Sequence, residues 1–217
     1  MRCEREINEI MNKTESIRRN TLIILDMLEK RELKLRGGFS PRPFMLAIDG
    51  RCGAGKSTLA TALKNALERR IPKPAVTILH ADDFFPRLEQ RTAERLKTPG
   101  GNFDHERFSE VVLRKLLINK PFSFRPFDCK SMSLAEPISV ESSHVAIIEG
   151  SYCLHPELRD HYDLKVFLDI DPEEQRERIL MREGEEKFNA FIERWIPMEE
   201  LYFNGCGVRE CADAVIK

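Results

Sequence analysis

Gly50-Arg51-Cys52-Gly53-Ala54-Gly55-Lys56-Ser57 is the most informative stretch of this sequence. It matches the pattern G-x-x-x-x-G-K-[ST] at every fixed position. Glycines in such a stretch let the backbone curl, so that successive N–H groups point at phosphate oxygens. A helix that starts near Lys56 adds its positive amino-terminal end. The stretch therefore predicts a cradle for the phosphate chain of a nucleotide.

Two residues of the cradle have chemical roles of their own. The lysine of this pattern reaches the β- and γ-phosphates, and the following hydroxyl binds Mg²⁺. We therefore expect ATP and Mg²⁺ as ligands, with Lys56 acting on the transferred phosphoryl group and Ser57 on the metal. The residues expected to bind the nucleotide are Gly50, Arg51, Cys52, Gly53, Ala54, Gly55, Lys56, Ser57 and Thr58.

A short apolar run lies just before the cradle. After the cradle, further short apolar runs alternate with amphipathic segments. The runs at 44–48, 75–79, 145–148, 165–168 and 214–216 are expected to be strands. Helices are expected at 56–70 and 108–117, and another begins after Asp171, which is placed to cap it. Strands and helices that alternate in this way predict an α/β fold with three layers, in which helices cover both faces of a parallel sheet.

The first 40 residues form a separate segment of the sequence. Apolar side chains recur at close to helical spacing across 4–35, with many charges between them. Gly37-Gly38 interrupts the pattern, and two prolines follow. We expect a helical extension over 1–40, packed on the core or on a partner subunit, and a main domain over 41–217.

The overall composition excludes several classes of protein. The 217 residues carry 35 basic and 36 acidic side chains, a net charge of −1, so no global field attracts nucleic acid. No apolar run approaches the roughly 20 residues that span a bilayer, and the charged N-terminus lacks the apolar core of a signal peptide. The six cysteines show no metal-ligand spacing. We expect a cytoplasmic protein with reduced thiols, no membrane contact and no nucleic-acid partner.

Carboxylates follow two of the expected strands directly. Asp82 and Asp83 come after the strand at 75–79, and Glu149 ends the strand at 145–148. The carboxyl ends of parallel strands meet at one edge of a sheet, so these side chains should face the cradle. Asp82 there could accept the proton of an attacking hydroxyl or hold Mg²⁺, and Glu149 could bind Mg²⁺. The alternatives are a turn cap for Asp82 and a salt bridge for Glu149.

With the cradle, three further stretches carry a resemblance to a known family. They are Asp82-Asp83-Phe84-Phe85, Asn102-Phe103-Asp104-His105 and Ile147-Ile148-Glu149-Gly150. The chain resembles the uridine kinase family over 44–217, whose relatives include nicotinamide riboside kinase, pantothenate kinase and phosphoribulokinase. The resemblance implies the P-loop NTPase fold. It also implies transfer of the γ-phosphoryl group of ATP to the 5′-OH of a nucleoside such as uridine or cytidine.

The resemblance also implies roles for residues around the acceptor. Asp82 is then the catalytic base, and Asp104 binds the ribose hydroxyls, although Asp104 could equally cap the helix that follows it. Phe127 takes the position of a tyrosine beside the nucleoside base, or packs in the core. The histidine by which the family contacts a pyrimidine has no match in 130–134, so that contact does not carry over.

Arginines on the helix after Asp171 resemble the family's lid. Arg178 and Arg182 lie four residues apart, on one helical face, where two guanidinium groups could stabilise the transferring phosphoryl group. The alternative is an ordinary solvated helix face. We expect the lid at about 182–197. It is shorter than the family's and lacks the usual R-G-R-D, and Ile179 stands where the family has a second arginine. Arg194 is a candidate replacement for the missing lid arginines.

Two other functional classes stay open beside a nucleoside kinase. The acceptor could be another small hydroxyl compound, such as nicotinamide riboside, pantothenate or a sugar. The protein could also be a P-loop ATPase or regulator with no acceptor. In either case the expected partner is a small molecule, and a homo-oligomer is possible.

Overall fold

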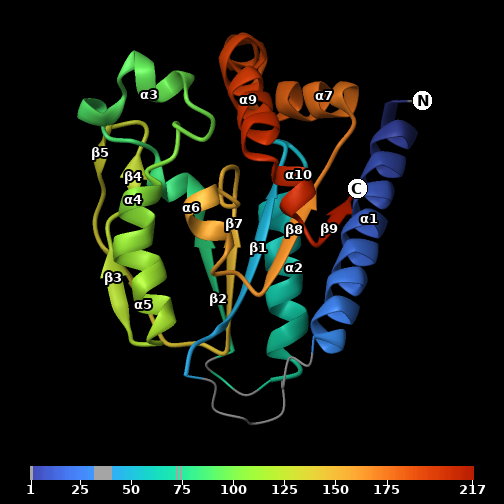
Figure 1. The fold of residues 1–217 in the computed structure, drawn as a ribbon. Helices are drawn as coiled ribbons and strands as arrows, with labels where there is room; N and C mark the ends of the chain where they lie inside the picture. Colours follow the sequence, from blue (N-terminus) through green and yellow to red (C-terminus); the bar gives the residue numbers. More distant parts are fainter. Residues whose placement is uncertain (1, 32–40, 72, 74) are drawn as a thin grey trace.

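Five parallel strands form the central sheet of the computed structural model, which describes residues 2–31, 41–71, 73 and 75–217, with 2–13 by backbone only. The strand order is β2-β7-β1-β8-β9, and every neighbouring pair is parallel (Figure 1). The strands are β1 (Phe44–Gly50), β2 (Val76–His80), β7 (Val145–Glu149), β8 (Leu164–Leu168) and β9 (Ala214–Ile216). All five strands expected from the sequence are present, with bounds within one or two residues.

Alternation along the strands divides the core into two layers. In β1, Leu46 and Ile48 face one cluster of buried side chains, and Met45 and Ala47 face the other. The first layer is completed by α1 (Arg2–Lys30) and α2 (Lys56–Glu68). The second is completed by α4 (His105–Phe108), η3 (Ser109–Leu113), α5 (Arg114–Leu117), α6 (Pro156–Arg159), α9 (Ile196–Cys206) and α10 (Val208–Cys211). The three-layer α/β prediction is therefore confirmed.

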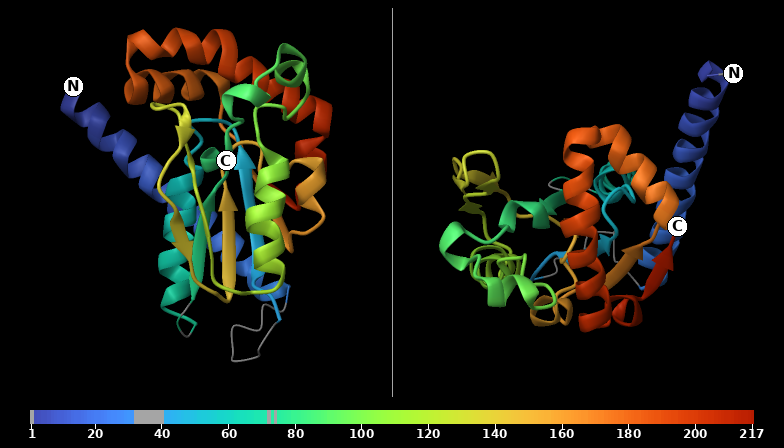
Figure 2. Two further views of the ribbon diagram at one scale, coloured as in Figure 1. Left: turned by 90° about the vertical axis from the view of Figure 1, so that its left-hand side faces the viewer. Right: turned by 90° about the horizontal axis from the view of Figure 1, so that it is seen from above.

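The remaining elements surround the carboxyl end of the sheet or flank it. Across that end run α7 (Pro172–Glu183), α8 (Glu185–Ala190) and the π-helical turn η4 (Phe191–Trp195), which leads into α9 (Figure 2). The other elements are the 3₁₀ turns η1 (Ala81–Phe84) and η2 (Leu88–Gln90), α3 (Ala93–Lys97), and the antiparallel pairs β3 (Phe122–Phe124) with β6 (Ile138–Val140) and β4 (Phe127–Asp128) with β5 (Ser133–Leu134). No pattern in the sequence predicted these short antiparallel pairs.

Helix α1 packs lengthwise on α2, beside the edge strand β9. Ile24 and Leu28 are fully buried in the layer that also contains Ile216. Arg31 forms an ion pair with Asp213 at 2.7 Å. The carboxyl-terminal part of α1 is thus part of the core, and Gly37-Gly38, expected to end the helical extension, lies outside the described residues.

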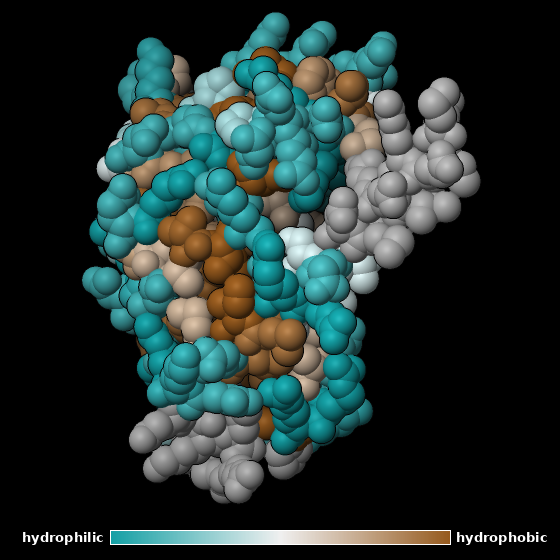
Figure 3. Space-filling view, turned by 90° about the vertical axis from the view of Figure 1, so that its right-hand side faces the viewer, coloured by the Kyte–Doolittle hydropathy of each residue, from teal (hydrophilic) through white to brown (hydrophobic). Residues whose placement is uncertain are grey.

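Apolar side chains also gather on the outer surface over α1 and β9 (Figure 3). Leu22, Ile23 and Val215 are exposed in this region. The expectation of a homo-oligomer stays a prediction. No helix in the described ranges combines the length and the apolar character that crossing a membrane requires.

Gly50 ends β1 where β8 lies closest to it. Its φ angle is 139°, and a Cβ atom there would lie 2.0 Å from the carbonyl oxygen of Leu168. Neither backbone can yield without breaking the β1–β8 register, in which Gly50 is opposite Leu168. The first glycine of the cradle is therefore required by strand packing as well as by the turn that follows it.

Candidate active site

The loop between β1 and α2 lines a pocket of about 1710 Å³ at the carboxyl end of the sheet. Residues 52–58 all line it, whereas Gly50 and Arg51 do not. Gly55 has φ 95° and immediately precedes α2, whose first N–H groups lie at the pocket. Open amide groups and a helix N-terminus make this loop suitable for binding an anion.

Lys56 is almost completely buried beneath the loop. Its Nζ donates hydrogen bonds to the carbonyl oxygens of Gly50 at 2.7 Å and Arg51 at 3.0 Å. The same atom lies 3.4 Å from the hydroxyl of Ser151. The ammonium group is thus held at the base of the cradle and within the pocket lining, where a phosphate could replace its carbonyl partners.

Arg51 is directed away from the pocket. Its Nε donates to Asp169 at 3.1 Å, and its guanidinium also forms an ion pair with Glu200. Arg209 donates to the second oxygen of Asp169 at 2.8 Å. The side chain of Arg51 therefore ties the loop to β8 and α9, and the expectation that Arg51 binds the nucleotide stays a prediction.

Ser57 and Glu149 lie together beside the cradle. The Ser57 hydroxyl donates to Oε2 of Glu149 at 3.1 Å, and His80 hydrogen-bonds the other oxygen. That hydrogen bond raises the pKa of His80. Within the described residues no cluster of three His, Cys, Asp or Glu side chains forms a metal site. A hydroxyl and a carboxylate nonetheless fit Mg²⁺, which binds few protein oxygens and keeps water and phosphate as its other ligands.

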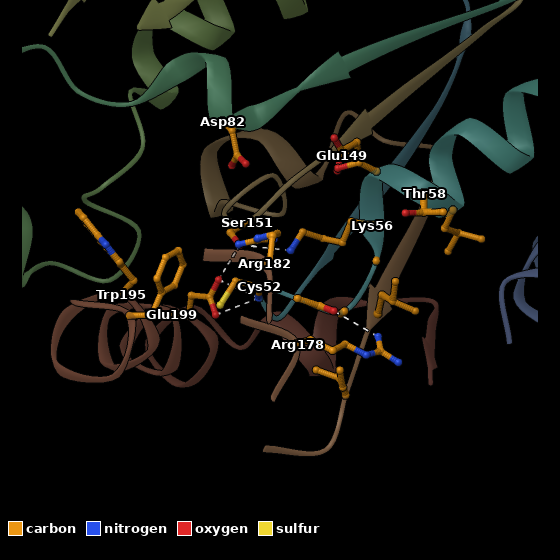
Figure 4. A pocket seen from close by; sticks show the side chains of 18 of the residues that line it. Cys52, Lys56, Thr58, Asp82, Glu149, Ser151, Arg178, Arg182, Trp195 and Glu199 are labelled. Carbon is orange, nitrogen blue, oxygen red and sulfur yellow. Dashed lines mark hydrogen bonds between the residues drawn. The ribbon is translucent and has the colours of Figure 1, made fainter. Parts of the chain in front are cut away.

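Asp82 is on η1, just after β2, and lines the same pocket. Its carboxylate is open to the pocket and shares it with Glu149 and Lys56 (Figure 4). The deep setting nevertheless removes much of the surrounding water, which raises the pKa of Asp82. Asp83 does not line the pocket, although burial raises its pKa as well. Of the two aspartates, Asp82 is the one placed to act on a ligand.

Asp104 and Phe127 lie just behind the pocket wall, and neither lines it. Asp104 is 1 % exposed, caps α4 by accepting from the amide of Arg107 at 3.1 Å, and forms an ion pair with that arginine. Phe127 is buried beneath the guanidinium of Arg91, which lies 5.1 Å from its ring centre and does line the pocket. The helix-cap alternative for Asp104 is thus observed.

Asn102 and Tyr152 also line the pocket and were not expected from the sequence. Within the part of the chain that the structure describes, the Asn102 side-chain oxygen is buried without a hydrogen-bond partner. Tyr152 has φ 75°, a conformation that bulky residues rarely adopt. Asn102 belongs to a stretch that the sequence analysis quoted, so a signal existed for it. For Tyr152 there was none.

The expected lid residues surround the opening of the pocket. Arg178 donates to the carbonyl oxygen of Gly53 at 3.2 Å and forms an ion pair with Glu174. Arg182 lines the pocket and pairs with Glu183 at 2.8 Å. Both arginines lie at the pocket as expected, each with an acidic partner on its own helix.

Two aromatic residues of the lid segment line the pocket near these arginines. They are Phe191 and Trp195, which come from η4. Arg194 does not line the pocket and instead stacks on the ring of Trp195 at 4.5 Å. This arrangement does not favour Arg194 as a replacement for the missing lid arginine.

Glu199 of α9 is the least expected residue at the cradle. Both of its carboxylate oxygens accept from the backbone N–H of Cys52, at 3.0 and 3.1 Å, and one accepts from Ser151 at 2.7 Å. The residue is 4 % exposed. A side-chain carboxylate thus accepts a hydrogen bond from a backbone amide of the anion-binding loop (Figure 4). The two residues are separated by 147 positions in the sequence, which explains why no local pattern revealed this contact.

Comparisons with known proteins agree with this geometry. The model of the family described as "Phosphoribulokinase / Uridine kinase family" matches residues 45–188. A uridine kinase of Alkaliphilus metalliredigens is 32 % identical over 155 residues, which cover 67 % of this chain and 71 % of that protein.

Two solved structures share the fold. A possible uridine kinase from Bacillus stearothermophilus matches with a TM-score of 0.65 and 21 % identity, over 92 % of this chain and 98 % of that one. A putative fructose transport system kinase from Silicibacter sp. matches with a TM-score of 0.69 and 22 % identity, over 88 % of this chain and 98 % of that one.

Proposed function

Because the chain belongs to the phosphoribulokinase and uridine kinase family, we propose that it transfers the γ-phosphoryl group of ATP to a hydroxyl of a small molecule. The acceptor group that we propose is the 5′-OH of a nucleoside of the uridine or cytidine kind. The observation that carries the proposal is a single pocket lined by a phosphate cradle, its lysine and the open carboxylate of Asp82.

The mechanism begins with binding of the nucleotide in the cradle. The amides of residues 52–58 and the N-terminus of α2 hold the β- and γ-phosphates. Lys56 exchanges the carbonyl oxygens that it contacts in this structure for phosphate oxygens. Mg²⁺, held by Ser57 and Glu149 with help from Asp82, would neutralise charge on the phosphates when bound.

Asp82 acts on the acceptor. It orients the hydroxyl in line with the γ-phosphorus and accepts its proton as the new P–O bond forms and the bond to the β-phosphate oxygen breaks. Its raised pKa makes it a better proton acceptor than an ordinary aspartate. Arg178 and Arg182 stabilise the charge on the transferring group, for which they must exchange their acidic partners for phosphate oxygens.

The acceptor would lie between Asp82 and the wall that contains Arg91 and Asn102. We propose that the Asn102 side chain turns on binding so that its buried oxygen accepts a hydrogen bond from a sugar hydroxyl. Asp104 lies one layer behind, where it supports the wall through Arg107. It would need a side-chain movement to reach the ribose that the family resemblance assigns to it.

An acceptor panel tests the proposal directly. ADP release is measured with MgATP and, separately, uridine, cytidine, nicotinamide riboside, pantothenate and a set of sugars, and the phosphorylated product is identified by mass. Turnover with uridine or cytidine at least tenfold above the rest supports a nucleoside kinase. If a different alcohol is preferred, the nucleoside would be wrong as the acceptor, but the assignment as a kinase would stand. ADP release that ignores every alcohol would instead indicate an ATPase.

A cytoplasmic location belongs to the same proposal, since a metabolite kinase draws on the ATP and the free metabolites of the cell interior. A direct test is fractionation of the cells that produce the protein, with ATP-dependent phosphorylation of the preferred acceptor followed in each fraction.

A further inference from the structure

Among the described residues, two that line the same pocket each carry a buried amide oxygen without a hydrogen-bond partner. One is Asn102, and the other is Asn20, on α1. Asn20 is 4 % exposed. A buried polar atom without a partner is costly, and proteins retain one where a ligand or water satisfies it. Asn20 therefore needs an explanation that the phosphate cradle does not supply.

The orientation of ATP in the pocket decides which of its groups reaches Asn20. Asp82 and Thr58 lie on opposite sides of the cradle (Figure 4). The γ-phosphoryl group must face Asp82, where the acceptor binds. The nucleoside end of ATP then extends the other way, past Thr58 and toward α1, whose residues Ser16, Arg19 and Asn20 line that end of the pocket.

Helix α1 is fixed firmly enough to form a binding wall. Ile24 and Leu28, one and two turns beyond Asn20, are fully buried in the layer with α2. Arg19 donates to the backbone carbonyl oxygen of Lys217, at the end of β9, and Lys217 also lines the pocket. The side of α1 that carries Asn20 is thus anchored to both neighbouring elements.

We propose that α1 forms the nucleoside-binding wall of the ATP site, and that the Asn20 side chain turns on binding so that its buried Oδ1 accepts a hydrogen bond from the 6-amino group of adenine. The inference rests on the proposed function, because it needs ATP in the cradle. It concerns a part of this chain outside the family match, which begins at residue 45. The N-terminal helix thereby becomes a determinant of nucleotide recognition.

Calorimetric binding to Asn20→Ala and Asn20→Leu tests this wall. The probes are MgATP, inorganic tripolyphosphate, which has only the phosphate chain, and purine riboside triphosphate, which lacks the 6-amino group. Loss of one neutral hydrogen bond should weaken MgATP binding by about 3- to 10-fold. Tripolyphosphate affinity should stay within about twofold of the wild type, and purine riboside triphosphate should bind the wild type about as weakly as MgATP binds Asn20→Ala.

The ligand-free variants supply a second readout. Removing a buried acceptor that has no partner should leave the melting temperature unchanged or raise it in Asn20→Ala. Asn65→Ala on the exposed face of α2 is the matched control, with wild-type binding of all three probes.

Three results would overturn the inference. They are wild-type MgATP affinity in both Asn20 variants, an equal loss of MgATP and tripolyphosphate, and equal wild-type affinity for the two nucleotides. If the wild-type protein binds neither MgATP nor tripolyphosphate, the proposed function itself is refuted. Failure of the inference about α1 and failure of the proposed function are therefore distinguishable.

Discussion

Asp82 is the residue on which the chemistry depends most directly. Asp82→Asn keeps the shape and loses the proton acceptor, so turnover should fall by about two to four orders of magnitude while MgATP affinity stays nearly intact. Steady-state kinetics and calorimetry measure the two quantities. Asp83→Asn is the matched control, because Asp83 does not line the pocket and its change should cost little activity. Normal turnover in Asp82→Asn would refute its assignment as the base.

Asp49 shows how a carboxylate behind the site responds to pH. It is fully buried and accepts from the amides of Gly50 and Leu154 and from the hydroxyl of Tyr202, the last at 2.7 Å. Burial nevertheless raises the pKa of Asp49 to about 6. Asp49 is therefore mainly protonated at pH 5 and ionised at pH 8, and its bond from Tyr202 is stronger in the ionised form.

Tyr202→Phe should accordingly destabilise the protein more as pH rises through 6. The expected loss in the free energy of unfolding is about 1 kcal/mol at pH 5 and about 2 kcal/mol at pH 8, because the lost bond favours the charged carboxylate. Urea unfolding at the two pH values measures the difference. Tyr162→Phe is the control, since its buried hydroxyl has no hydrogen-bond partner among the described residues and its removal should cost little at either pH. An equal loss for Tyr202→Phe at both values would contradict the argument.

At the scale of elements, α9 competes with the nucleotide for the cradle. Its Glu199 carboxylate accepts from the amide of Cys52, which a phosphate would otherwise use. Glu199→Gln removes the negative charge and should tighten MgATP binding by roughly tenfold, because like charges a few ångströms apart repel strongly in a poorly solvated site. Isothermal titration measures the affinity.

Glu210→Gln on α10 changes the same charge at an exposed position and should leave that affinity unchanged. Weaker ATP binding in Glu199→Gln would mean that Glu199 supports the cradle instead of competing for it.

Elements with a local signal were predicted well from the sequence. Each of the five strands is an apolar run, and the strand-end residues Asp82 and Glu149 were placed at the pocket because parallel strands end at one edge. The contacts of Glu199 and Asn20 could not be predicted, since they depend on how α9 and α1 pack against a distant loop. The direction of the Arg51 side chain, toward Asp169, could not be predicted either, because motif membership says nothing about where a side chain points.

At the scale of the whole molecule, nucleotide binding should stabilise the fold. MgATP at about 100 times its dissociation constant adds about 2.7 kcal/mol to the free energy of unfolding. For a chain of this size that corresponds to a rise of about 5–10 °C in melting temperature. Lys56→Ala should lose most of this shift and most of the turnover, whereas Lys64→Ala, on the outer side of α2, should keep both. A full shift in Lys56→Ala would count against the cradle.

The close approach of β1 and β8 at Gly50 decides which mutation can be used to remove the activity of this protein in a living cell. A methyl group there would collide with the carbonyl oxygen of Leu168, so the substituted chain would lose its central strand pairing and be degraded. The phenotype of such a strain would reflect loss of the folded protein and not loss of its catalytic activity alone. A strain with a substitution at Lys56 would retain the folded protein without its activity, so the two effects could be distinguished.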